Sequence, residues 1–125
     1  MISEKEIRMF LNKKGAISKE ILRKLLEELK KNKLSTSQVT GLITLFGQEQ
    51  FKEARKEVEK YLDSPNALER YSALSTIVYE WGVQDIRGKI ETMIRTEPDE
   101  DVRSNAVGCL GSLLRGSHDK KALRL

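Results

Sequence analysis

The chain contains few of the residues that build metal sites or covalent cross-links. Its 125 residues include one histidine, one cysteine and two prolines, and aromatic residues make up only 6%. A single cysteine, Cys109, cannot form an internal disulfide, which suits a reducing compartment. One histidine and one cysteine do not supply a metal-binding set with the usual ligand spacing. The composition therefore argues against a disulfide scaffold and against a metal centre of the common type.

Targeting and catalytic signals are also missing. No apolar run approaches the roughly 20 residues that span a bilayer, and the first residues lack an apolar signal region. The sequence shows no nucleophile motif of the serine or cysteine type and no glycine-rich phosphate loop. We therefore expect a cytoplasmic protein that is not an enzyme and uses no cofactor.

Charge is abundant but unevenly distributed. Charged residues make up 34% of the chain, and the net charge is +4. Residues 1–62 carry 14 Lys/Arg and 9 Asp/Glu (+5), whereas residues 63–125 carry 9 and 10 (−1). The lysines either solvate outer helix faces and helix C-termini or form a patch for nucleic acid or an acidic partner. The basic region is interrupted by glutamates and lacks interleaved aromatic rings, which single-strand binding requires.

Every long segment has the 3.6-residue hydrophobic period of a helix, and none alternates like a strand. We predict an all-α fold of about seven helices in which capping boxes at Ser3, Ser35 and Asn66 begin three helices. Leu68 and Tyr71 fall on the apolar face of the fifth. The predicted helices cover residues 3–15, 18–33, 35–47, 49–62, 66–82, 85–95 and 99–115, followed by a short one at 119–125.

Two turn-and-helix segments resemble each other. They begin at Ser64-Pro65-Asn66 and at Glu97-Pro98-Asp99, so their prolines differ by 33 in residue number. This period is typical of helical-repeat arrays. We therefore predict one domain, divided into a helix pair (1–33), two repeats (34–64 and 65–97) and a partial repeat (98–125). The positions that match across the two segments are Arg70 and Arg103, Ala73 and Ala106, and Ile77 and Leu110.

The segment from Met93 to Arg103, followed by Ala106, Leu110 and Gly111, resembles the HEAT-like repeat family, the type also found in phycobilisome lyases. The resemblance implies a short right-handed α-solenoid of stacked antiparallel helix pairs, in which the helix after each turn lines the concave side. It also implies a structural ladder in which the arginine after each turn pairs with acids of the turns. By match, Arg103 would pair with Asp99, and Arg70 with Asp63.

The residues left on the concave side are mostly small and uncharged, which suits a protein partner better than a phosphate backbone. We expect a non-enzymatic interaction module, either a bacterial scaffold or adaptor or a toxin-immunity protein. The alternatives are a nucleic-acid-binding HEAT-like protein that uses the basic N-terminal half and a phycobilin lyase-like protein. The short last helix leaves the face of Leu110, Leu113 and Leu114 incompletely covered, so we expect the C-terminal edge to form a homodimer or pack on a partner. The predicted partner-binding residues are Glu69, Ser72, Thr76, Tyr79, Asn105, Ser112 and Arg115.

Overall fold

The structure, a computed structural model, describes residues 1–116. All regular elements in this part of the chain are helices joined by short connections, and none is a strand, which confirms the all-α prediction. The short helix expected over residues 119–125 lies outside the described residues. The elements are α1 (Glu4–Leu11), α2 (Lys19–Lys30), α3 (Thr36–Gln48), η1 (Lys52–Ala54), α4 (Arg55–Lys60), η2 (Tyr61–Asp63), α5 (Ala67–Ser75), the π-helical turn η3 (Thr76–Glu80), α6 (Arg87–Thr96) and α7 (Glu100–Gly116).

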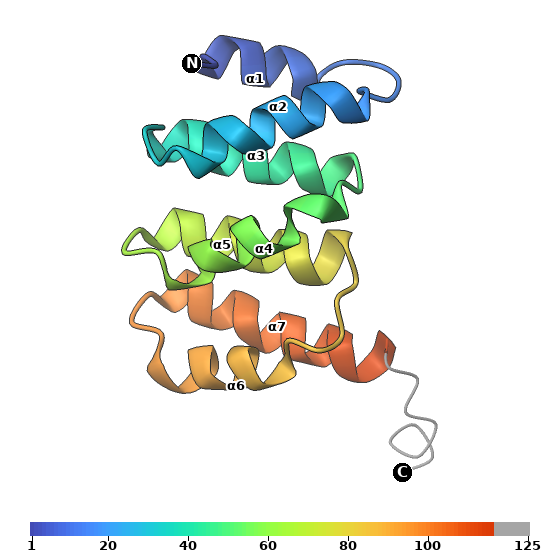
Figure 1. Cartoon of the computed structure of the whole chain (residues 1–125). Coiled ribbons are helices and arrows are strands. Elements are labelled where there is room, and N and C mark those ends of the chain that lie inside the picture. Colours follow the sequence, from blue (N-terminus) through green and yellow to red (C-terminus); the bar gives the residue numbers. More distant parts are fainter. Residues whose placement is uncertain (117–125) are drawn as a thin grey trace.

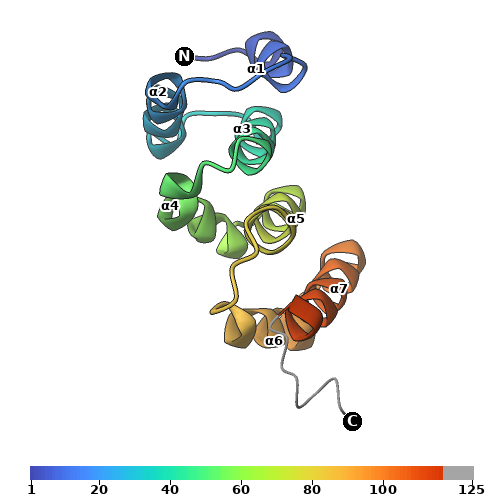
Figure 2. The same ribbon diagram turned by 90° about the vertical axis from the view of Figure 1, so that its right-hand side faces the viewer.

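Successive helices run in opposite directions and pile up along one axis (Figure 1). The odd-numbered helices α1, α3, α5 and α7 lie along one side of the stack, and α2, α4 and α6 lie along the other (Figure 2). Each odd-numbered helix contacts the next odd-numbered one, and α6 also packs against α7. We call the two sides the odd layer and the even layer. No helix within residues 1–116 is both long enough and apolar enough to cross a membrane.

Side-chain caps begin the helices of the odd layer. The capping boxes predicted at Ser3 and Ser35 are confirmed, because each serine accepts from the amide three residues on, and Glu6 or Gln38 accepts in return from the serine amide. The box predicted at Asn66 is wrong in part. Asn66 caps the amides of residues 68 and 69, but its own amide donates to Ser64 Oγ, and the Glu69 carboxylate accepts from that hydroxyl instead.

Helix α3 ends differently from the prediction. Gly47 was expected to terminate it, and a new helix was expected at Glu49. Instead α3 continues to Gln48, and Gln50 takes a left-handed backbone conformation with φ 53°. The Gln50 amide bonds the Gly47 carbonyl, and the Phe51 amide bonds the Phe46 carbonyl, which is a Schellman ending. The two phenylalanine rings pack with centroids 5.4 Å apart, and the next element begins at Lys52.

Glycine allows α3 to approach its neighbours closely. A β-carbon at Gly41 would lie 2.7 Å from a side-chain carbon of Ile7 in α1. One at Gly47 would lie 3.0–3.2 Å from the side chains of Glu80 and Thr76 in η3. Both glycines therefore serve packing within the odd layer, and neither ends a helix.

Candidate functional site

The exposed apolar side chains of α5 and η3 gather on one part of the odd layer. Leu68 is 66% exposed, Tyr71 42% and Tyr79 51%. The sequence placed Leu68 and Tyr71 on the core side of α5, so this expectation is wrong. Together with three polar residues of α7 the three side chains line a hollow of about 560 Å³. We call this surface the tyrosine face, which consists of Leu68, Tyr71, Tyr79, Asp101, Ser104 and Asn105.

A π-helical turn shapes one end of the tyrosine face. In η3 the Trp81 amide donates to the Thr76 carbonyl five residues back, at 3.0 Å. The wider turn lets Thr76, Ile77 and Val78 be buried in succession, while Tyr79 points outward. Two hydrogen bonds from η3 to α3 hold the turn: Thr76 Oγ1 donates to the Ile43 carbonyl, and Trp81 Nε1 donates to the Phe46 carbonyl.

The Tyr79 ring leans across the surface of α7. A β-carbon at Gly108 would lie 2.8 Å from the Tyr79 hydroxyl, so glycine leaves room for this side chain. Burial of the hydroxyl, and the neighbouring Cys109, raise the pKa of Tyr79. Burial likewise raises the pKa of the Cys109 thiol to about 11. Both groups therefore stay protonated at neutral pH, and Tyr79 offers a neutral aromatic surface with a hydroxyl.

Asn105 fixes the spacing between the two helices of the tyrosine face. Its side-chain amide donates to Ser75 Oγ at 3.0 Å and lies 3.5 Å from the Tyr71 carbonyl. A ligand would have to compete with these bonds, so Asn105 mainly positions α7 against α5. The tyrosines therefore lie on α5 and η3, whose spacing from α7 is held by hydrogen bonds within the protein itself.

The remaining predicted partner-binding residues do not form one site. Thr76 is only 4% exposed, so its assignment to a binding surface is wrong. Glu69 is half-buried and accepts from Thr36 Oγ1 and Ser64 Oγ, so it ties α5 to α3. Ser72 lines a separate hollow between α1 and α3. On α7, Ser112 is half-buried, and the exposed Arg115 lies close enough to affect the pKa of Tyr79.

In the predicted arginine ladder, Arg70 pairs with an acid other than the one expected. Arg70 makes a bidentate ion pair with Glu97 at 2.7 and 2.8 Å, and its Nη1 donates to the Ser64 carbonyl. The expected partner Asp63 instead pairs with Lys89. The Arg70 guanidinium lowers the pKa of Glu97, against burial, which raises it. The side chains are only 13% and 3% exposed, so this pair belongs to the interior.

Arg103 was expected to pair with Asp99. Its Nη1 donates instead to the Glu97 carbonyl at 3.1 Å, and the Asp99 carboxylate caps α7 by accepting from the Val102 amide. Within residues 1–116 no carboxylate forms an ion pair with Arg103. Arg70 and Arg103 each bond the carbonyl six residues earlier in the chain. The carboxylate that pairs with Arg70 belongs instead to Glu97, in the next turn along the chain.

The even layer carries a repeated ion pair that the sequence analysis missed. Arg23 pairs with Glu53, and Arg55 pairs with Asp85, each across 30 residues. The second pair repeats the first one unit later, because the arginine and its acid both advance by the same step along the chain. The signal was present in the sequence, because arginines at 23, 55 and 87 each precede a glutamate by four residues, at 27, 59 and 91.

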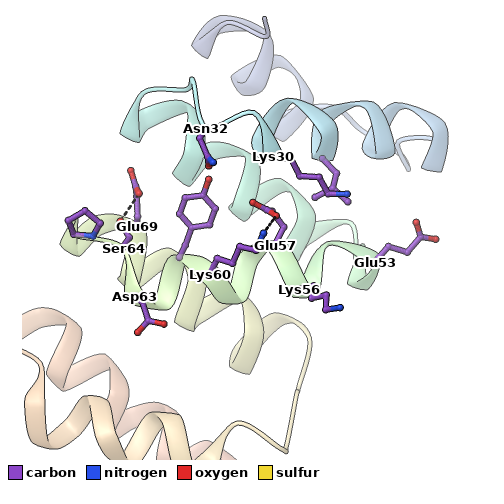
Figure 3. A pocket seen from close by; sticks show the side chains of 12 residues that line it. Lys30, Asn32, Glu53, Lys56, Glu57, Lys60, Asp63, Ser64 and Glu69 are labelled. Atoms are coloured by element: carbon purple, nitrogen blue, oxygen red, sulfur yellow. Dashed lines mark hydrogen bonds and ion pairs between the residues drawn. The ribbon is translucent and has the colours of Figure 1, made fainter.

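A hollow of about 730 Å³ lies between α2 and α4 in the even layer (Figure 3). Lys30, Lys56 and Lys60 reach it, but so do Glu53, Glu57, Asp63 and Glu69. Burial, with Glu57 and Glu69 nearby, raises the pKa of Tyr61 on its wall to about 12. This mixture of charges resembles a solvated ion-pair network more than a site for one anion or cation.

The basic residues of the N-terminal half are partly neutralised in the same way. On α2 and at its C-cap, four bases each lie within 4.0 Å of a glutamate oxygen: Arg23, Lys24, Lys30 and Lys31. Within residues 1–116 no group of three His, Cys, Asp or Glu side chains is placed to hold a metal ion.

No protein-family model, no curated protein and no solved structure matches this chain. The tyrosine face combines exposed aromatic and aliphatic side chains, a concave shape and a frame held by hydrogen bonds.

Proposed function

We propose that the protein is a non-enzymatic interaction module of the HEAT-like helical-repeat type, a short right-handed α-solenoid that binds a protein partner through the tyrosine face. The observation that carries the proposal is the joint exposure of Leu68, Tyr71 and Tyr79 around one hollow. Tyrosine is enriched at the energetic centres of protein interfaces because a rigid ring with a hydroxyl gains contact area at a small entropic cost.

Two register relations support the repeat part of the proposal. In the even layer, the pair of Arg23 with Glu53 recurs one unit later as the pair of Arg55 with Asp85. In the two matching segments, Arg70 and Arg103 each bond the carbonyl six residues back. Stacked units of similar size produce such relations because each unit contacts only its neighbours.

The charge pattern favours a protein partner over nucleic acid, the alternative function. A phosphate-binding surface needs cations free to replace counterions. Four bases of α2 already face glutamates, and the tyrosine face contributes Asp101 and no lysine. Nothing in the described residues favours a lyase-like activity, the remaining alternative from the family resemblance.

The proposal is tested with the full chain and a Tyr71→Ser/Tyr79→Ser variant immobilised side by side. We expect a protein from the source organism to bind the parent chain and the variant to bind it at least about tenfold more weakly, as for interface anchors. Met9→Ser is the matched control, because it removes a side chain that is 65% exposed on α1, far from this face.

Equal binding of the partner to the parent and to the tyrosine variant would contradict the proposal. A mobility shift with nucleic acid at low salt that disappears at high salt, without protein binding, would favour the alternative.

A further inference from the structure

The C-terminal edge of the described stack has side chains that are buried one unit earlier. Val107 of α7 is 54% exposed, whereas Leu74, at the matching position of α5, is fully buried. Leu110 is half-buried, whereas Ile77 is fully buried. Helix α5 has α3 on one side and α7 on the other, but within residues 1–116 α7 has an odd-layer neighbour only on the α5 side. The outer side of α7 therefore resembles a stacking surface.

Two arginines at this edge repeat the poses of two arginines inside the stack. Arg87 Nε bonds Glu91 at 2.8 Å, as Arg55 Nε bonds Glu59 at 2.8 Å. Arg103 Nη1 bonds the carbonyl six residues back, as Arg70 Nη1 does. These contacts with residues four or six positions away hold both guanidinium groups as the inner arginines are held.

The inner arginines each have a second partner. Arg55 also pairs with Asp85, and Arg70 pairs with Glu97. Both acids lie later in the chain and flank α6: Asp85 precedes this helix and Glu97 follows it. In residues 1–116, Arg87 and Arg103 have no carboxylate in these positions.

We propose that the C-terminal edge docks two consecutive helices of another protein, the first of which has an acidic residue at each end. The second helix would lie over Val107 and Leu110 as α7 lies over α5. The two carboxylates would bind Arg87 and Arg103 in the places that Asp85 and Glu97 occupy one unit earlier. Because those acids flank a helix of 10 residues, α6, the partner carries its acids at the two ends of a first helix of similar length.

Charge selects this occupant over a second copy of the chain. A symmetric dimer through the edge would bring two pairs of arginines together, and like charges at an interface oppose association. Stacking the edge on the N-terminal end of another copy would place it against the half of the chain that carries 14 Lys/Arg and 9 Asp/Glu. A partner with acidic residues at this interface would avoid both kinds of repulsion between positive charges.

The test places the photo-cross-linking residue p-benzoylphenylalanine at position 107 of the full chain in the organism of origin, and sequences the cross-linked segment. We expect a segment of a different protein in which the cross-linked helix follows a helix about as long as α6 that has an acid at each end. With that protein purified, Arg87→Gln/Arg103→Gln should weaken binding about tenfold or more and reduce its salt dependence. Arg95→Gln is the matched control, because Arg95 is an exposed arginine of α6, the helix of Arg87, and its side chain bonds only Thr92.

Several results would overturn the proposal. They are a cross-link to a second copy, a cross-link to the chain's own residues after Gly116, a segment without acidic residues, no cross-linked product, or full affinity of the double arginine variant. The same cross-linker at position 68 probes the tyrosine face separately. Failure at one surface therefore does not imply failure at the other.

Discussion

The middle of the stack and its C-terminal end place matching side chains in different surroundings. Arg70 lies in the middle with a side chain that is 13% exposed and a bidentate carboxylate partner. Arg103 is the matching residue at the end and is exposed, with one bond to a backbone carbonyl. The difference arises from the residues that follow, because each arginine bonds the carbonyl six residues back and only Arg70 also pairs with an acid later in the chain. Matching residues in this chain should therefore have unequal energetic roles.

The largest effect is expected from the buried ion pair. Arg70→Ala leaves Glu97 buried without its cation and should lower the free energy of unfolding by about 3–5 kcal/mol. Arg103→Ala removes an exposed side chain and should change it by about 0.5 kcal/mol or less. Urea unfolding followed by circular dichroism measures both. Similar losses for the two variants would show that burial by the next unit does not distinguish these positions.

Replacing a glycine by alanine should change the stability in opposite directions in the middle of the stack and at its end. Gly47→Ala adds a β-carbon 3.0–3.2 Å from Glu80 and Thr76, so it should destabilise the protein by about 1–3 kcal/mol. Gly88→Ala, in α6, meets no atom within 4 Å and should stabilise the protein by up to about 1 kcal/mol. Thermal unfolding of the two variants gives the comparison, and a destabilising Gly88→Ala would contradict it.

The buried pair should also make the middle of the stack sensitive to acid. Because the pKa of Glu97 is lowered in the folded state, its stabilising contribution is present above the unfolded-state pKa of a glutamate, about 4.3. It is lost as the pH falls through the lower, folded-state value. The stability difference between the parent chain and Glu97→Gln should therefore shrink as urea unfolding is repeated from about pH 6 down to about pH 3. A difference that is constant over this range would rule out this contribution.

Small effects are expected from the accessible ion pairs of the even layer. Arg55→Ala breaks exposed pairs with Glu59 and Asp85 and should destabilise the protein by up to about 1 kcal/mol at low salt, and by less at high salt. Arg87→Ala breaks only the pair with Glu91 and should have a smaller effect. Melting temperatures of both variants at two salt concentrations test whether Arg55→Ala loses more stability than Arg87→Ala. A larger loss for Arg87→Ala would contradict this ranking.

Local sequence signals predicted the helices well and their ends less well. Caps at Ser3 and Ser35 were correct because a serine and its own helix supply both halves of the bond. The end at Gly47 was wrong because that glycine is required by a neighbour, η3, which lies much later in the chain. A rule based on local composition contains no information about such a neighbour.

The binding residues were predicted less accurately than the helices. Tyr79 and Arg115 do lie on the surface, but Thr76 is buried because its side chain packs against α3, next to Gly47, and donates to the Ile43 carbonyl. Leu68 and Tyr71 were placed in the core because they are apolar at helical spacing. The hydrophobic period could not show that this side of α5 stays open beside α7.

By itself, the sequence determined the helical class, two capping boxes and the recurrence of arginine at positions 70 and 103, because each depends on residues a few positions apart or on a simple count. Only the tertiary structure decided that Glu97 binds Arg70, that Thr76 is buried and that the tyrosines share one hollow. These features depend on which side of each helix its neighbours cover, and residues distant in the sequence determine that coverage.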